Sequence, residues 1–155
     1  MIELPKNYRA LFQIAVQWAH DQEKFILENG IELTTDLKID AYQIGVKEIE
    51  KVRLLKVDKI PMPSDPRLSS VLDDIRLLNN STIGTSYRYG ILIKSDHWLK
   101  RKLVVHELVH TMQYERFGSI EAFLKQYIAE CIDPGYPMGA LEQEAWRIED
   151  EVCKK

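Results

Sequence analysis

The sequence has 155 residues, which is within the usual length of one domain, and its hydrophobic content of 45% is enough to bury a core of ordinary size. We therefore expect one domain that spans residues 1–155. The formal net charge is −3, and no run of Lys or Arg stands out. This balance argues against a nucleic-acid partner.

The N-terminus lacks the basic start and apolar stretch of a secretion signal, and nowhere do about 18 apolar residues follow one another. These features predict a cytoplasmic protein that does not insert into a membrane. Cys131 and Cys153 lie far apart and form no CxxC pair, which favours two reduced thiols with structural roles.

The first part of the chain predicts two helices and a strand. Apolar residues recur at helical spacing over residues 8–28, and the Asn-Gly pair at 29–30 supplies a stop. A shorter helix is expected over residues 37–44, with Gly45 at its end. The apolar and β-branched run at 51–57 favours a strand.

Prolines and turn-forming residues divide the middle of the chain. Residues 61–70 hold three prolines within six positions and are expected to form a crossing loop. A short helix around 69–78 should follow, and the polar residues at 79–86 suit turns. Alternating apolar residues at 87–94 indicate a strand.

The last part of the chain predicts helices. Residues 95–98 offer capping side chains for a helix that runs to about residue 117, where Gly118 ends it. Another helix is expected over 119–131, and a last one from about 140 to the C-terminus. The predicted fold class is therefore α+β, mainly helical with a small sheet.

The segment from Val104 to Gln113 carries two histidines four residues apart, with a glutamate directly after the first. Residues at this spacing lie on one helix face, so His106 and His110 can direct two imidazoles at one metal ion. Glu107 is turned by about 100° around the helix axis, which places its carboxylate beside the metal rather than on it.

This spacing is the H-E-x-x-H arrangement of metalloproteases. Zinc accepts neutral imidazole nitrogens and keeps one position for water in catalytic sites. It lowers the pKa of that water to about 7, and Glu107 can then take the proton as a general base. Apolar residues surround the motif, as expected for a helix buried on most sides. Two core histidines paired with carboxylates are the alternative interpretation.

The segment resembles the active-site helix of zinc-dependent metallopeptidases of the zincin class. No histidine follows His110, which excludes the branch with a third histidine in H-E-x-x-H-x-x-G-x-x-H. The gluzincin branch takes a glutamate from a later helix, commonly within E-x-x-A, and residues 142–145 fit this pattern. The resemblance favours Glu142 as the third ligand, whereas helical phase alone leaves Glu142 and Glu144 both open. Trp146 stands where the family often has an aspartate.

Residues 84–148 are similar to small bacterial HExxH proteins that are mostly uncharacterised, and the motifs HELVHxxQYxxxG and GYPxxxLExEA carry the similarity. This resemblance implies a minimal gluzincin fold. Such folds place a strand above the active-site helix, antiparallel to a bound peptide, and residues 87–94 are the candidate. An ordinary buried strand is an equally good interpretation of that segment.

A peptidase also needs a hydrogen-bond donor for the oxyanion of its transition state. Tyr136, in the loop before Glu142, is the first candidate for this role, and His97 is the second. Gln113 and Tyr114 follow the second histidine and could orient a ligand, although both could equally be packing residues.

Taken together, the sequence predicts a zinc metallopeptidase that acts on a peptide or protein substrate. In this interpretation His106, His110 and Glu142 bind Zn²⁺, and Glu107 and Tyr136 are catalytic. The alternative is a non-catalytic zinc-binding module of the same kind, used for partner binding or sensing.

Overall fold

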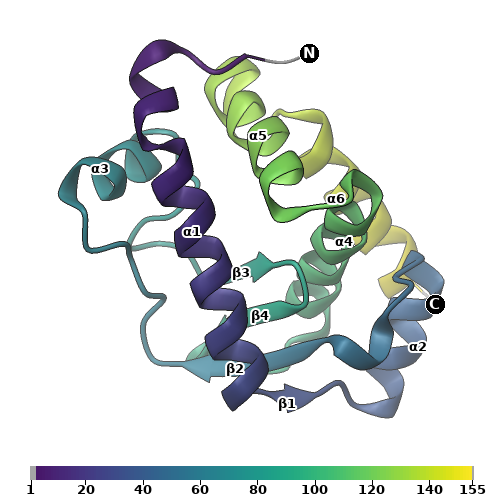
Figure 1. The fold of residues 1–155 in the computed structure, drawn as a ribbon. Helices are drawn as coiled ribbons and strands as arrows, with labels where there is room; N and C mark the ends of the chain where they lie inside the picture. Colours follow the sequence, from purple (N-terminus) through teal and green to yellow (C-terminus); the bar gives the residue numbers. More distant parts are fainter. Residues whose placement is uncertain (1–2, 155) are drawn as a thin grey trace.

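The computed structural model describes residues 3–154 as helices packed around one small mixed sheet (Figure 1). The helices are α1 (Lys6–Asn29), α2 (Thr35–Ile44), α3 (Pro66–Asp74), α4 (Arg101–Phe117), α5 (Ile120–Glu130) and α6 (Ala140–Cys153). The strands are β1 (Ile31–Glu32), β2 (Arg53–Val57), β3 (Gly84–Tyr87) and β4 (Gly90–Lys94). The α+β class, mainly helical with a small sheet, is therefore confirmed.

The strands are ordered β1-β2-β4-β3 across the sheet. β4 runs parallel to β2 and antiparallel to β3, and β1 runs antiparallel to β2. β3 and β4 form a hairpin in which Tyr87 is opposite Gly90 and Gly84 is opposite Ile93. Consequently β3 is an edge strand, and β4 has a neighbour on each side.

The single strand expected over 87–94 is wrong, because the chain reverses at Arg88 and Tyr89. Arg88 has φ 63°, a left-handed conformation that residues other than glycine rarely adopt. Two tertiary contacts hold it there. Its guanidinium donates two hydrogen bonds of 2.8 Å to Glu23, and its carbonyl accepts one of 2.6 Å from the Thr111 hydroxyl.

Most helix boundaries agree with the sequence, and two do not. α3 begins within the expected loop, because Asp65 accepts hydrogen bonds from the amides of Arg67 and Leu68 and Pro66 suits the first helical turn. The expected capping of α4 by residues 95–98 is also wrong. Those residues begin with a 3₁₀ turn at Ser95–His97, and α4 starts at Arg101 without a side-chain cap.

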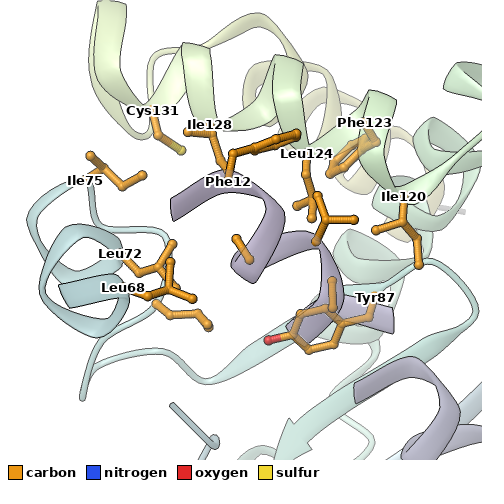
Figure 2. Close-up of a cluster of buried hydrophobic side chains, with 14 of the residues drawn as sticks. Phe12, Leu68, Leu72, Ile75, Tyr87, Ile120, Phe123, Leu124, Ile128 and Cys131 are labelled. Carbon is orange, nitrogen blue, oxygen red and sulfur yellow. The ribbon is translucent and has the colours of Figure 1, made fainter. Parts of the chain in front are cut away.

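Helices cover both faces of the sheet, and each face has its own hydrophobic cluster. Leu92 of β4 packs into the cluster formed with α1, α3 and α5, part of which is shown in Figure 2. Its neighbours Ile91 and Ile93 pack into the cluster formed with α2, α4 and α6. This alternation follows from the pleat of a strand. It places α4 directly against the sheet.

An ion pair between the exposed Arg101 and the buried Asp40 ties α2, α4 and α6 together. The Arg101 guanidinium donates to the Asp40 carboxylate over 3.0 and 2.9 Å, and also to the Val152 carbonyl over 3.2 Å. Ala145 of α6 is completely buried, and its small side chain lets α6 lie close to α4. These contacts set where α6 lies along α4.

Both cysteines are free thiols, as the sequence predicts, and Cys131 is the buried one. Among residues 3–154, no helix is long and apolar enough to cross a membrane.

The crossing of α1 over the sheet leads to a first prediction. A Cβ atom at Gly90 would lie 2.9 Å from the Cβ atom of Ile26, whose side chain is completely buried. We therefore expect Gly90→Ala to lower the free energy of unfolding by about 1–3 kcal/mol in chemical denaturation. Ile39→Ala, at a half-exposed position of α2, is the control and should change it by less than about 0.5 kcal/mol. An unchanged Gly90→Ala protein would contradict this close approach.

Candidate metal centre

The two motif histidines lie in the middle of α4, and Glu142 lies in the first turn of α6. The Nε2 atom of His106 is 2.7 Å from one carboxylate oxygen of Glu142, and the Nε2 atom of His110 is 3.1 Å from the other. One ligand atom from each of the three residues lies within 4.8 Å of the others, and all three side chains are buried. Together these residues could hold a metal ion.

α6 brings Glu142 rather than Glu144 to the histidines. Leu141 and Ala145, which flank Glu142 on the buried face, pack into the core. Glu144 turns toward Arg116 and accepts hydrogen bonds of 2.7 and 3.0 Å from its guanidinium. Of the two glutamates that helical phase left open, only Glu142 contributes to the cluster.

Each of the three candidate ligands has a second partner. The Nδ1 atom of His106 lies 3.1 Å from Glu149 Oε1, and that of His110 lies 2.8 Å from Gln113 Oε1. The Tyr127 hydroxyl donates a hydrogen bond of 2.8 Å to Glu142. Outer partners of this kind fix ring orientation, so both Nε2 atoms face the same point.

Two of these outer partners were not predicted from the sequence. Glu149 follows Glu142 by two helical turns and therefore lies on the same face of α6, a signal that periodicity could have supplied. It provides a carboxylate one turn beyond Trp146, the position where the resemblance expects an aspartate. Tyr127 comes from α5, and no spacing in the sequence connects it with Glu142.

Gln113 has the predicted orienting geometry, and Tyr114 does not. The Gln113 side chain is completely buried, and its Nε2 atom donates to the Leu141 carbonyl over 2.9 Å and to Glu144 over 2.7 Å. It therefore connects His110 with the backbone next to Glu142. The Tyr114 hydroxyl donates instead to the Ser86 carbonyl in β3, over 3.1 Å.

The electrostatics of the cluster favour positive charge between the three side chains. Burial alone would lower the pKa of His106, but its contacts with Glu142 and Glu149 raise that pKa to about 10. Burial alone would raise the pKa of Glu142, but hydrogen bonds from the two histidines lower it well below its usual range. The same field that favours a proton on the His106 ring would attract a metal cation.

Glu107 is buried beside the cluster and adds no atom to it. Burial raises the pKa of Glu107, and the nearby charges of His110 and His106 offset part of that rise. Glu107 thus lies near the three candidate ligands without being one of them.

A cavity of about 810 Å³ lies over the cluster, bordered by β3 and residues 73–83 before it on one side and by α5 and α6 on the other. Glu107 and Tyr136 both line it, whereas His97 does not. Burial, with smaller contributions from Glu142 and Glu107, raises the pKa of Tyr136 to about 12. The Tyr136 phenol therefore keeps its proton near neutral pH and can act as a hydrogen-bond donor.

The fold and the site define a mainly helical α+β protein with a buried group of two histidines and one glutamate. In comparisons with known proteins, no family model, no curated protein and no solved structure matches this chain.

The contacts of Gln113 lead to a second prediction. Gln113→Met keeps the volume of the side chain but removes its contacts with His110 and Leu141. We expect it to raise the dissociation constant for zinc about 10- to 100-fold, measured by competition with a chromogenic chelator. Gln17→Met, at an exposed position of α1, should leave the constant unchanged. Equal zinc affinity in both variants would exclude an orienting role for Gln113.

Proposed function

We propose that this protein is a zinc-dependent metallopeptidase of the gluzincin kind, which hydrolyses peptide bonds. The observation that carries the proposal is the convergence of His106, His110 and Glu142 at one buried point, with Glu107 beside them. Two imidazoles and one carboxylate form a donor set found in catalytic zinc sites. Zinc bound by these residues would polarise the substrate carbonyl and lower the pKa of water.

Glu107 is the general base in this proposal. Its carboxylate takes a proton from the attacking water and gives it to the leaving amine nitrogen as the C–N bond breaks. A catalytic base works best when its pKa is near the operating pH, and burial shifts the pKa of Glu107 in that direction. Its position next to the ligands, rather than among them, supports this role.

Tyr136 is the proposed donor to the oxyanion. It lies in the loop before α6 and lines the cavity together with the three ligands and Glu107. Its raised pKa keeps the hydroxyl proton available, as electrostatic stabilisation of an oxyanion requires. Tyr127, whose hydroxyl is bonded to Glu142, acts through that ligand and is a positioning residue.

A third prediction separates chemistry from metal binding. We expect Glu107→Gln to lower kcat on a fluorogenic peptide by a factor of about 10²–10⁴, because the general base is lost. Its zinc content, measured by elemental analysis, should stay close to that of the unmodified protein. Glu121→Gln, on the exposed side of α5, should keep full activity. Zinc loss in Glu107→Gln would show that the roles are assigned wrongly. Zinc binding without hydrolysis by any variant would favour the non-catalytic module.

A fourth prediction compares the two tyrosines. Tyr136→Phe removes the proposed oxyanion donor, so kcat should fall by about 10²–10³ while zinc affinity is unchanged. Tyr127→Phe removes the hydrogen bond to Glu142, so zinc affinity itself should fall. Tyr42→Phe, at a position that is 77% exposed, serves as the control. If Tyr136→Phe keeps full kcat, the oxyanion donor lies elsewhere.

A further inference from the structure

The first turn of α6 carries Glu142, and the residue before this turn offers no side chain to cap it. The N-cap position is occupied by Gly139. A Ser, Thr, Asp or Asn at an N-cap accepts a hydrogen bond from the amide two or three residues further along. In α6 the first of these amides belongs to Leu141, which is buried. Its amide therefore needs a partner from elsewhere in the protein.

Glu130, the last residue of α5, supplies this cap. Its Oε1 atom accepts a hydrogen bond of 2.8 Å from the Leu141 amide. Its Oε2 atom accepts one of 2.6 Å from the side chain of Gln126, one turn earlier in α5, which fixes the orientation of the carboxylate. Negative charge at this end of α6 is also favoured by the helix dipole. A carboxylate of one helix thus caps the next helix in the chain.

The close approach of Glu130 explains the glycine at the start of α6. A Cβ atom at Gly139 would lie 2.6 Å from the Cβ atom of Glu130 and 2.9 Å from its Oε1 atom. Gly139 has φ −65°, which other residues adopt readily, so the backbone conformation does not require glycine. The lack of space does. The Glu130 side chain occupies the place that a capping side chain of α6 itself would fill.

The same hydrogen bond closes the loop that carries Tyr136. The chain leaves α5 at Glu130, passes through residues 131–139 and then enters α6 (Figure 1). The bond from the Leu141 amide to Glu130 joins the two ends of this loop. Next to Tyr136, the Pro137 carbonyl accepts a hydrogen bond of 2.8 Å from a side chain of α6. The position of Tyr136 therefore depends on how the loop is fastened to both helices.

α5 contacts the segment around Glu142 at two points. Tyr127 and Glu130 are three residues apart and lie on the same face of α5. The Tyr127 hydroxyl donates to the Glu142 carboxylate, and Glu130 accepts from the amide of the preceding residue. One contact therefore acts on the side chain of the candidate ligand, and the other acts on its backbone.

We propose that Glu130 is a positioning residue, which caps α6 from α5 and thereby holds Glu142 at the histidines and Tyr136 beside the cavity. The effect on Tyr136 rests on the metallopeptidase function proposed above, whereas the effect on Glu142 requires only the metal centre. Without the cap, the start of α6 has more than one position, and zinc binds only the fraction of molecules in which Glu142 faces the histidines. The apparent dissociation constant rises as the inverse of that fraction.

The first test measures zinc binding by competition with a chromogenic chelator. Glu130→Ala removes the cap and should raise the dissociation constant about 5- to 30-fold, the factor that corresponds to the loss of a helix cap. Glu130→Gln keeps an oxygen that can accept the Leu141 amide, so its constant should stay within about 3-fold of that of the unmodified protein. Glu121→Ala removes a carboxylate from the exposed side of α5 and should leave the constant unchanged.

Gly139→Ala displaces the Glu130 carboxylate without removing it. The added methyl group would overlap the Glu130 side chain, so this variant should also weaken zinc binding. Circular dichroism establishes that each variant is folded. If Glu130→Ala does not fold, Gly139→Ala decides in its place.

The second test measures kcat on the fluorogenic peptide at saturating zinc. Glu130→Ala should lower kcat about 10-fold or more, because the oxyanion donor Tyr136 is no longer held in place. In the Tyr136→Phe background the same substitution should lower kcat by less than about 2-fold, because the donor is already absent. A general loosening of the structure would lower kcat by the same factor in both backgrounds.

The outcomes separate this proposal from the peptidase function. Unchanged zinc affinity in Glu130→Ala overturns the positioning role, and so does an equal loss of affinity in Glu130→Gln. Equal losses of kcat in the two backgrounds overturn the part that concerns Tyr136. If the protein binds zinc and cleaves no peptide, the peptidase function and the role of Tyr136 are overturned, whereas the zinc constants still decide on Glu130. If the protein takes up no zinc, both proposals are overturned.

Discussion

The contact of the Glu142 carboxylate with His106 and His110 is the interaction on which the rest of the site depends, because it joins α4 to α6 at a buried point. Buried charged groups are costly unless each one is paired and hydrogen-bonded. Here each of the three side chains has a further hydrogen-bond partner. α4 and α6 are also clamped on both sides of the cluster. Arg101 at the start of α4 binds the end of α6 through Val152, and Arg116 near the end of α4 binds Glu144 near the start of α6. Two antiparallel helices fixed at both ends hold their facing side chains in one arrangement, which is what a preorganised site requires.

The sheet contributes the opposite border of the cavity, and its position is fixed by polar contacts rather than by strand pairing alone. Glu23 of α1 holds Arg88 at the hairpin turn, and Thr111 and Tyr114 of α4 hold the last residues of β3. The hairpin is therefore attached to α1 on one face of the sheet and to α4 on the other. An edge strand presents unpaired backbone groups, and the structure partly covers this edge while leaving Gly84 beside the cavity. The same contacts thereby fix where β3 lies relative to the candidate ligands.

The sequence predicted the elements whose signals are local. Helical periodicity, Gly45 and Gly118 placed helix ends closely, and H-E-x-x-H placed two imidazoles on one face because that spacing is a property of the helix itself. The hairpin could not be predicted, since the turn has no glycine or asparagine and Arg88 takes its left-handed conformation from contacts with α1 and α4. For the same reason Tyr127 was missed, because its role depends on how α5 packs against α6. Only the family resemblance favoured Glu142 over Glu144 as a ligand. In the structure Leu141 and Ala145 pack into the core, and this packing turns Glu142 toward the histidines.

The central claim is that one metal ion is bound by two imidazoles from α4 and one carboxylate from α6. The zinc K-edge X-ray absorption spectrum of the purified protein, loaded with one equivalent of zinc, tests it most directly. We expect two imidazole ligands at about 2.0–2.1 Å together with oxygen donors. We also expect the carboxylate contribution to be lost in Glu142→Ala. A spectrum without imidazole scattering, or a protein that takes up no zinc, would contradict it.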